Sequence, residues 1–368
     1  MTNPNWSKTP GGKVRGRGLG LPFPGTPGPF NAITDIACVE IGYSTLIRGD
    51  GALARGQGPV RTGVTVLLPR GRGNAGTPCF AGGAILNGNG EMTGLAWIDE
   101  IGQLQTPITI TNTHSCGVTR DATLKWMVEN AIGMGQDWGL PVAAETWDGE
   151  LNDINGFHVK DEHVFAALDS AAGGPLELGS LGGGTGMICY DFKGGNGSAS
   201  RRVEIGGDTY MLGVFVQANF GRREQLTVLG APVGRAIPHG KLRHRDAGSV
   251  IAIVATDAPL LPHQLKRIAR RVTLGLARTG TAGGQSSGDI FLAFSTANPE
   301  ALAAGPTMRH SRFLDDAALD PLFVATVEAT EEAVVDSMIA NATMIGRDGN
   351  VCVALPHDEL LAAMARPA

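Results

Sequence analysis

A serine that begins an apolar run is the residue best suited to chemistry in this sequence. Gly248 and Ser249 precede the run Val250-Ile251-Ala252-Ile253-Val254-Ala255, and a short β-branched run of this kind predicts a buried strand. The glycine lets the backbone bend, so the Ser249 hydroxyl could attack the carbonyl that precedes it. Hydrolysis of that bond would make Ser249 a new N-terminus, whose α-amine, with a reference pKa of about 8, could act as a general base. The alternative is a loop glycine before an ordinary strand-starting serine.

Polar residues at two other strand ends could assist such a nucleophile. Asn219 follows an apolar strand, where its amide N–H could point at a developing oxyanion; the alternative is a turn-forming asparagine. Ser287 and Asp289 lie two residues apart at the entrance of another apolar run. They could orient a nucleophile or bind an amine, unless they belong to a flexible loop with an ordinary capping aspartate.

An acidic segment follows a third predicted strand. Glu145, Asp148 and Glu150 lie close together there, with Trp147 among them. Carboxylates at a strand end could hold a cationic ammonium group. The alternative is an exposed acidic loop.

Two glycine-rich segments, 88–94 and 182–186, resemble phosphate-binding loops only in composition. Neither has the G-x-G-x-x-G spacing that opens a helix or the G-x-x-x-x-G-K-[ST] pattern, so no nucleotide site is expected. His114 and Cys116 would share one face of an extended segment and could form a thiol–histidine pair, although a structural role is the better interpretation.

Composition narrows the class of protein. The 368 residues can bury a substantial core, and the 54 glycines, spread over the whole chain, indicate many tight turns and close backbone approaches. The net charge of -5 is made of interleaved charges, which does not favour a nucleic-acid partner. Five widely spaced cysteines without a C-x-x-C pattern favour reduced structural thiols in a cytoplasmic protein, without a metal site. Neither a signal peptide nor an apolar membrane span is recognisable, so no membrane partner is expected.

The elements that must position these residues follow from periodicity and turn signals. Regular structure is expected to begin within 33–47, and strands are predicted at 63–68, 80–86, 107–111, 141–145, 202–205, 211–218, 250–255, 290–295 and around 351–354. Helices are predicted after Asp121 and at 162–171, 262–280, 321–340 and 357–364. Strands in successive groups, without regular β-α-β alternation, favour an α+β layered fold that is largely antiparallel.

Three further segments complete this outline. Residues 1–29, rich in Gly and Pro, form an irregular arm, and the polar stretch 230–248 is predicted to be an exposed loop just before the cleavage point. In the helix at 262–280 one face is apolar, while the opposite face carries four basic residues and is expected to be solvated; the basic residues are Lys266, Arg267, Arg270 and Arg271.

Taken in order, these segments resemble the DmpA/β-aminopeptidase family, also called peptidase family S58 and typified by an L-aminopeptidase D-Ala-esterase/amidase. The resemblance covers essentially the whole chain beyond the arm. It rests on the motifs GTPG (25–28), NAITD (31–35), NGNGEMTG (87–94), TNTHS (111–115), ETWDG (145–149), QANFG (217–221), GS (248–249), SSGDI (286–290) and FSTAN (294–298).

The family resemblance implies a fold and an assembly. The expected fold is an αββα sandwich that resembles N-terminal nucleophile hydrolases and is shared with ornithine acetyltransferases. The chain would form a single domain, 1–368, and would cleave itself between Gly248 and Ser249 into 1–248 and 249–368. Both chains would stay associated, in a homo-oligomer that is a tetramer of cleaved protomers.

The resemblance also implies a role for each site residue. Ser249 would be the nucleophile and Asn219 an oxyanion donor, and Ser287 with Asp289 would orient the serine and its amine. Asp289 stands where some β-peptide-specific members have a glutamate.

The substrate-binding positions follow in the same way. Glu145 would bind the free ammonium of the substrate, beside Trp147. This tryptophan stands where the D-Ala-esterase type has a tyrosine.

The expected function is therefore a self-processing serine aminopeptidase that removes N-terminal residues from small peptides, amides and esters. Its acyl-enzyme would form on Ser249 without metal or organic cofactor. The alternatives on the same scaffold are a β-aminopeptidase and an aminoacyl or acyl transferase, although ornithine acetyltransferases use a threonine nucleophile. A non-catalytic binding protein is disfavoured, because Ser249 and Asn219 are both present.

Overall fold

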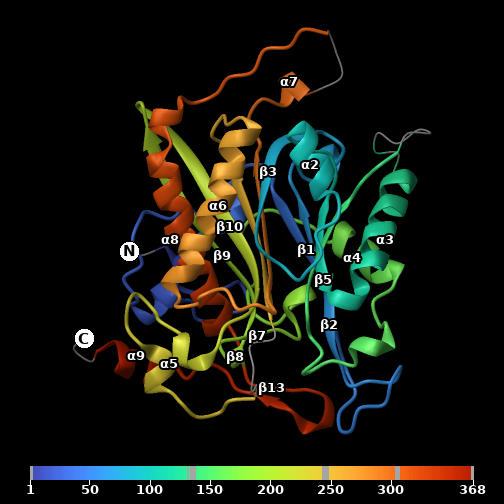
Figure 1. Ribbon diagram of the computed structural model, residues 1–368, viewed down its shortest axis with the longest axis vertical. Coiled ribbons are helices and arrows are strands. Elements are labelled where there is room, and N and C mark those ends of the chain that lie inside the picture. The colour runs from blue at the N-terminus through green and yellow to red at the C-terminus, as the bar shows by residue number, and fades with distance from the viewer. Residues whose placement is uncertain (1–2, 131, 133–137, 243–247, 303–306, 366–368) are drawn as a thin grey trace.

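Two β-sheets lie face to face between two layers of helices (Figure 1). The computed structural model describes residues 3–130, 132, 138–242, 248–302 and 307–365. The four-stranded sheet contains, in sheet order, β1 (Glu40–Arg48), β2 (Val60–Leu68), β5 (Ile108–Asn112) and β6 (Val142–Thr146). The six-stranded sheet contains β4 (Gln103–Leu104), β3 (Cys79–Gly88), β12 (Gly288–Ser295), β11 (Ser249–Thr256), β10 (Asp208–Asn219) and β9 (Gly195–Ile205). Two short hairpins pair β7 (Ile188–Cys189) with β8 (Phe192–Lys193) and β13 (Met344–Ile345) with β14 (Val351–Cys352).

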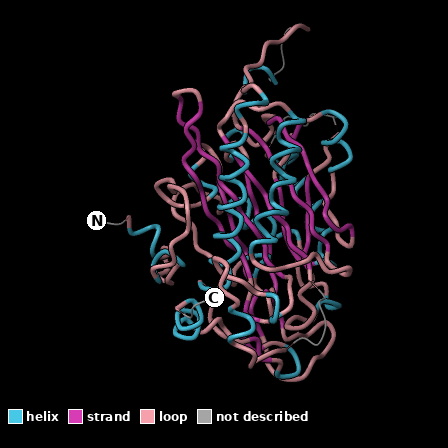
Figure 2. Tube along the Cα trace, turned by 60° about the vertical axis from the view of Figure 1, so that its left-hand side comes forward, coloured by secondary structure: helices cyan, strands magenta, loops and turns pink. Residues whose placement is uncertain are grey.

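Long helices cover the outer face of each sheet. Helices α3 (Cys116–Glu129) and α4 (Asp161–Asp169) pack on the four-stranded sheet, and α6 (Pro262–Arg278) and α8 (Asp320–Ile339) pack on the six-stranded sheet, in front of its strands in Figure 2. The shorter helices are α1 (Pro4–Ser7), α2 (Leu95–Ile101), α5 (Val233–Ala236), α7 (Pro299–Leu302) and α9 (His357–Met364). The layers are therefore helix, sheet, sheet and helix, as predicted. No helix in the described part of the chain is both long and apolar enough to cross a bilayer.

Strand β11 is apolar throughout because both of its faces are buried. Val250, Ala252 and Val254 pack in the core beneath α6 and α8, whereas Ile251 and Ile253 pack between the two sheets. Successive side chains of a strand point to opposite faces, so a one-residue slip would exchange the two sets. This alternation fixes the register of β11 and places Ser249 on the face that looks toward the other sheet.

The helix predicted at 262–280 forms as α6, with the expected apolar face buried against the six-stranded sheet. Its basic face contacts neighbouring side chains as well as solvent. Lys266 Nζ lies 2.5 Å from the Asp99 carboxylate, and the guanidinium of Arg271 lies 3.8 Å from the ring centroid of Phe323.

Two predictions of local structure are wrong. Strand β9 begins at Gly195 rather than near residue 202, because its small polar residues are buried beneath α8; a Cβ on Gly197 would lie 1.8 Å from the Ala333 oxygen. The segment 230–242 is not simply an exposed loop, since Val233 and Ile237 are buried. Residues 243–247 of that predicted loop lie outside the described residues.

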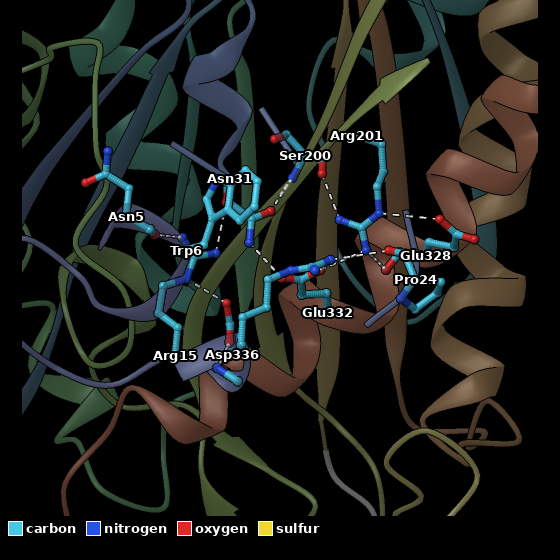
Figure 3. A network of polar contacts seen from close by, with 12 residues as sticks. Asn5, Trp6, Arg15, Pro24, Asn31, Ser200, Arg201, Glu328, Glu332 and Asp336 are labelled. Atoms are coloured by element: carbon cyan, nitrogen blue, oxygen red, sulfur yellow. Dashed lines mark hydrogen bonds and ion pairs between the residues drawn. The ribbon is translucent and has the colours of Figure 1, made fainter. Parts of the chain in front are cut away.

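The N-terminal arm is attached to α8 by a buried charged network (Figure 3). Arg15 Nε donates to Asp336 at 2.8 Å, and Arg17 Nε donates to Glu332 at 2.8 Å. Arg201 on β9 donates to the same Glu332 carboxylate at 2.8 Å. An arm with little regular structure is thus held by charge-assisted hydrogen bonds, which are stronger than neutral ones.

Candidate active site

The ends of several strands meet around one cavity of about 440 Å³. Strands β6 and β11 contribute their terminal residues, and the loops after β3 and before β12 close its sides. The residues that line it are Asn89, Thr113, Glu145, Trp147, Gly248, Ser249 and Ser286. The predicted nucleophile and the predicted ammonium-binding carboxylate, 104 residues apart in sequence, therefore face the same space.

Ser249 is the first residue of β11 and is almost completely buried, with 3% of its surface exposed. It pairs with Asn219 of β10 on one side and with Gly288 of β12 on the other. The preceding Gly248 has no room for a side chain, because a Cβ there would lie 1.8 Å from the Asn219 carbonyl oxygen. Close backbone approach therefore requires glycine before the serine.

Asn219 is held rigidly opposite Ser249. Its side-chain oxygen accepts a hydrogen bond from the Ile188 N–H at 2.9 Å, and its side-chain nitrogen donates to the Trp147 carbonyl at 2.7 Å. Directly paired residues of antiparallel strands place their side chains on one face, with Cβ atoms roughly 5 Å apart. The Asn219 amide is thus fixed in orientation on the sheet face that also carries the Ser249 side chain.

Ser287 and Asp289 form a buried hydrogen-bonded pair at the entrance of β12. The Ser287 hydroxyl donates to one Asp289 oxygen at 2.5 Å, and the Asn87 side-chain amide donates to the other at 3.0 Å. Gly288 between them packs against the loop after β3, where a Cβ would meet the Asn89 oxygen at 2.4 Å. The Asp289 carboxylate is consequently fixed from two sides.

Glu145 is the carboxylate that faces the cavity. It is buried, and it accepts hydrogen bonds from the Thr113 hydroxyl and, at 3.0 Å, from the Glu91 backbone N–H. Burial raises the pKa of Glu145, whereas these two hydrogen bonds oppose the rise. Asp148 is buried elsewhere, and burial raises its pKa to about 7, opposed by hydrogen bonds from neighbours that include Asn152. Glu150 lies 3.9 Å from Arg347 and does not line the cavity.

Comparison with known proteins identifies the family. The profile of peptidase family S58 matches residues 31–352. The chain belongs to peptidase family S58. This S58 chain is 48% identical over 367 residues to the β-peptidyl aminopeptidase BapA of Sphingosinicella microcystinivorans, with 96% of this chain and 92% of that protein covered.

Two solved structures are similar over nearly their whole length. The L-aminopeptidase D-Ala-esterase/amidase from Ochrobactrum anthropi, described as a prototype for the serine aminopeptidases, is 47% identical with a TM-score of 0.90, covering 95% of this chain and 98% of that one. The β-aminopeptidase from a Burkholderia species is 46% identical with a TM-score of 0.87, covering 96% and 100%. The first is described as a variant of the Ntn hydrolase fold, and the αββα layers of this chain have that fold. The S58 chain is an aminopeptidase, hence a hydrolase that acts on peptides.

Contacts with Asn219 and Gly149 fix the position of Trp147 in the S58 site. Its carbonyl accepts the Asn219 hydrogen bond, and its indole ring lies against Gly149, where a Cβ would come within 2.7 Å of the ring. Any larger residue at 149 would push the indole away, so Gly149 sets the position of this cavity wall.

Sequence reasoning gave no role to three residues that the structure places in the site. Asn87 holds Asp289, Asn89 donates to the Ser286 carbonyl at 2.8 Å, and Thr113 holds Glu145. Asn87 and Asn89 belong to the NGNGEMTG motif (87–94), which contributed to the family resemblance without a role for either asparagine. The alternation of asparagine and glycine directly after the predicted strand 80–86 was the signal in the sequence that could have indicated their role.

Cys116 is structural, as predicted. Its thiol donates to the Ala143 carbonyl at 3.4 Å, and burial raises its pKa to about 12, so it is a poor nucleophile. His114 instead stacks on Phe157, with ring centroids 5.7 Å apart. None of the five cysteines forms a disulfide, and no group of three metal-binding side chains gathers among the described residues.

Proposed function

We propose that this S58 aminopeptidase is a self-processing enzyme that uses Ser249 as its nucleophile. It would act on small peptides, amides and esters that carry a free N-terminal amine. The observation that carries the proposal is the shared cavity: a strand-starting serine after an obligatory glycine faces a buried carboxylate suited to an ammonium group.

In the first step, the Ser249 hydroxyl attacks the Gly248 carbonyl carbon. An ester forms between Gly248 and the Ser249 oxygen, the Gly248–Ser249 amide bond breaks, and the nitrogen takes up a proton. Water then hydrolyses the ester. The products are a carboxylate at Gly248 and a Ser249 with a free hydroxyl and a free α-amine.

Turnover repeats this chemistry on a substrate. The Ser249 oxygen attacks the substrate carbonyl while the Ser249 α-amine takes the hydroxyl proton and delivers it to the leaving group. Asn219 stabilises the oxyanion, and Ser287 with Asp289 orients the serine and its amine. Water releases the acyl group and restores the free hydroxyl.

The substrate class follows from Glu145 and the relatives. A buried carboxylate favours substrates whose ammonium group can pair with it. N-acylated peptides lack this group and would be excluded. Similarity to a β-peptidyl aminopeptidase and to an L-aminopeptidase D-Ala-esterase/amidase supports substrates whose N-terminal residue has either an α- or a β-amino acid backbone. A panel of L-, D- and β-aminoacyl amides measures the preference.

Replacing Glu145 with Gln tests the recognition of the amine. The ratio of kcat/KM between free-amine and N-acetylated amides should fall about ten- to a hundredfold, because a charge-assisted hydrogen bond is lost. The matched control is Glu150→Gln, since Glu150 lies in the same acidic segment without lining the cavity; its ratio should equal that of the wild type. Equal wild-type kcat/KM for free and acetylated substrates would refute the aminopeptidase specificity proposed for this cavity.

The two chains would remain associated after cleavage. The cations Arg15 and Arg201 of the charged network (Figure 3) precede residue 249, and the carboxylates Glu328, Glu332 and Asp336 follow it. Arg17, which pairs with Glu332, also precedes the cut. Strand β11 also pairs with β10 across the cut. The family resemblance supports a tetramer of such cleaved protomers, which the mass of the native particle measures.

Arg15→Met should weaken this association. Removing one partner of a buried ion pair typically costs about 3–5 kcal/mol, so the urea midpoint should fall and the two chains should separate at lower protein concentration. Native mass spectrometry detects the separated chains. Arg202→Met serves as the control, because the Arg202–Glu204 pair is exposed on both sides. Unchanged association in Arg15→Met would show that the Arg15–Asp336 pair is not needed to hold the chains together.

A further inference from the structure

Glu145 is held from both sides of its strand. Thr113 directly follows β5, which lies parallel to β6 and places Thr111 beside Glu145 in the register. On the other side of β6, Met92 bridges to Ala144, so the adjacent Glu91 N–H is brought to the carboxylate. The two hydrogen-bond donors therefore come from separate elements that flank the same strand.

The position of Thr113 is itself fixed by a capped turn. The Asn112 side chain accepts a hydrogen bond from the Ser115 N–H at 3.0 Å and donates to the Thr62 hydroxyl at 2.7 Å. Thr113 also lines the cavity that contains Ser249. Its hydroxyl is thus presented to Glu145 by a rigid turn at the cavity wall.

A buried carboxylate needs donors to stay charged. Glu145 has 3% of its surface exposed, and the loss of hydration disfavours its anion. An ionised carboxylate has about four acceptor positions, and an ammonium has three donors. The two donors therefore stabilise the anion and still leave acceptor positions for a substrate ammonium.

We infer that Thr113 is a positioning residue for amine recognition: its hydroxyl keeps the Glu145 carboxylate charged and aimed at the substrate ammonium. The inference rests on the proposed role of Glu145. It assigns Thr113 a place in the specificity of the enzyme without contact with the reacting atoms.

Other charged groups around Glu145 affect the same equilibrium. The Glu91 carboxylate raises the pKa of Glu145 and His114 lowers it, after the larger effects of burial and the two hydrogen bonds. Cys116 lies close enough for Glu145 to raise the pKa of its thiol. In the cleaved enzyme the Ser249 α-amine would face the same cavity. A test must separate the titration of Glu145 from that of this amine.

The experiment compares Thr113→Val with Thr113→Ser in the cleaved enzyme. The valine variant keeps the shape and loses the hydroxyl, whereas the serine variant keeps the hydroxyl. For each, kcat/KM is measured from pH 4 to 9 on an aminoacyl aryl ester and on its des-amino analogue, and the ratio is plotted against pH. Because the Ser249 amine acts on both substrates, its titration cancels in the ratio.

Thr113→Val should lower the ratio about tenfold at pH 7, since a hydrogen bond to a charged group is lost. Without that donor the pKa of Glu145 rises further. As the pH is lowered, the ratio should therefore begin to decrease at a pH about one unit higher than in the wild type. Thr113→Ser should restore the wild-type ratio and pH profile. Thr93→Val is the matched control, because the Thr93 hydroxyl also contacts this strand segment, at Pro141 and Ala143, but does not touch Glu145.

The outcomes separate the two proposals. If Glu145→Gln leaves the ratio unchanged, Glu145 does not recognise the amine and the proposed function fails. If Glu145→Gln lowers the ratio while Thr113→Val keeps the wild-type ratio and pH profile, only the role of Thr113 is overturned. A uniform loss of activity in Thr113→Val, with an unchanged ratio, would also overturn it, because this would indicate a general structural role.

Discussion

Ser249→Ala is expected to remain a single chain of 368 residues and to lose peptidase activity by a factor on the order of 10⁶ in kcat, the cost of removing the nucleophile in a serine protease. The same hydroxyl attacks Gly248 in maturation and the substrate in turnover, so one substitution should abolish both. Intact-mass analysis of the purified protein distinguishes one chain from fragments of 248 and 120 residues.

Ser249→Cys is the matched control. A thiol is also a nucleophile, so this variant should still cleave itself, more slowly, whereas the alanine variant should not. Thermal unfolding of Ser249→Ala shows whether the uncut protein is folded. A wild-type preparation that is fully active as one uncut chain would contradict the mechanism, since the base is the α-amine released by cleavage.

The second large effect is expected at Asn219. Asn219→Ala should lower kcat by about 10²–10³ with a small change in KM, because a fixed donor acts mainly on the charge that develops in the transition state. Steady-state kinetics on one aryl amide measures both parameters. Asn219→Asp keeps an acceptor for the Ile188 N–H but loses the donor, so its kcat should fall to a similar extent.

The competing explanation for Asn219 gives a different result. Its amide also holds the Trp147 carbonyl, so a purely positioning role would displace the tryptophan wall of the cavity. In that case KM would rise while kcat stayed near the wild-type value. Such a result would remove Asn219 from the catalytic step and leave it as a support for the binding pocket.

The sequence predicted the strands that carry the site because their apolar patterns are local. The run after Ser249 is apolar on both faces, and only a strand buried between a helix layer and a second sheet satisfies such a pattern. Asn219 and Asp289 were recognised because each stands where such a run ends or begins. The motifs that carry the resemblance added the expected roles and the family, and the comparisons confirmed the family.

Local patterns failed where burial is decided by a distant element. The segment 195–201 is small and polar, yet it is a buried strand because α8, more than a hundred residues later, packs on it. By residue type alone, the acidic segment 145–150 at the end of β6 offered three carboxylates of equal standing, although the family resemblance favoured Glu145. Only the register of β6 against β5 and the loop after β3 decides that Glu145 faces the cavity, while Asp148 is buried away from it.

By itself, then, the sequence determined the chemical groups, the strands whose first or last residues carry them, and the glycine that precedes Ser249. The tertiary structure alone decided which of these groups meet. Thr113 and Glu91 reach Glu145 from elements on opposite sides of one strand, and Asn87 reaches Asp289 from a neighbouring strand of the same sheet. Contacts of this kind join residues that are 32 to 202 positions apart. They depend on sheet order and register, and a local pattern of residues contains neither.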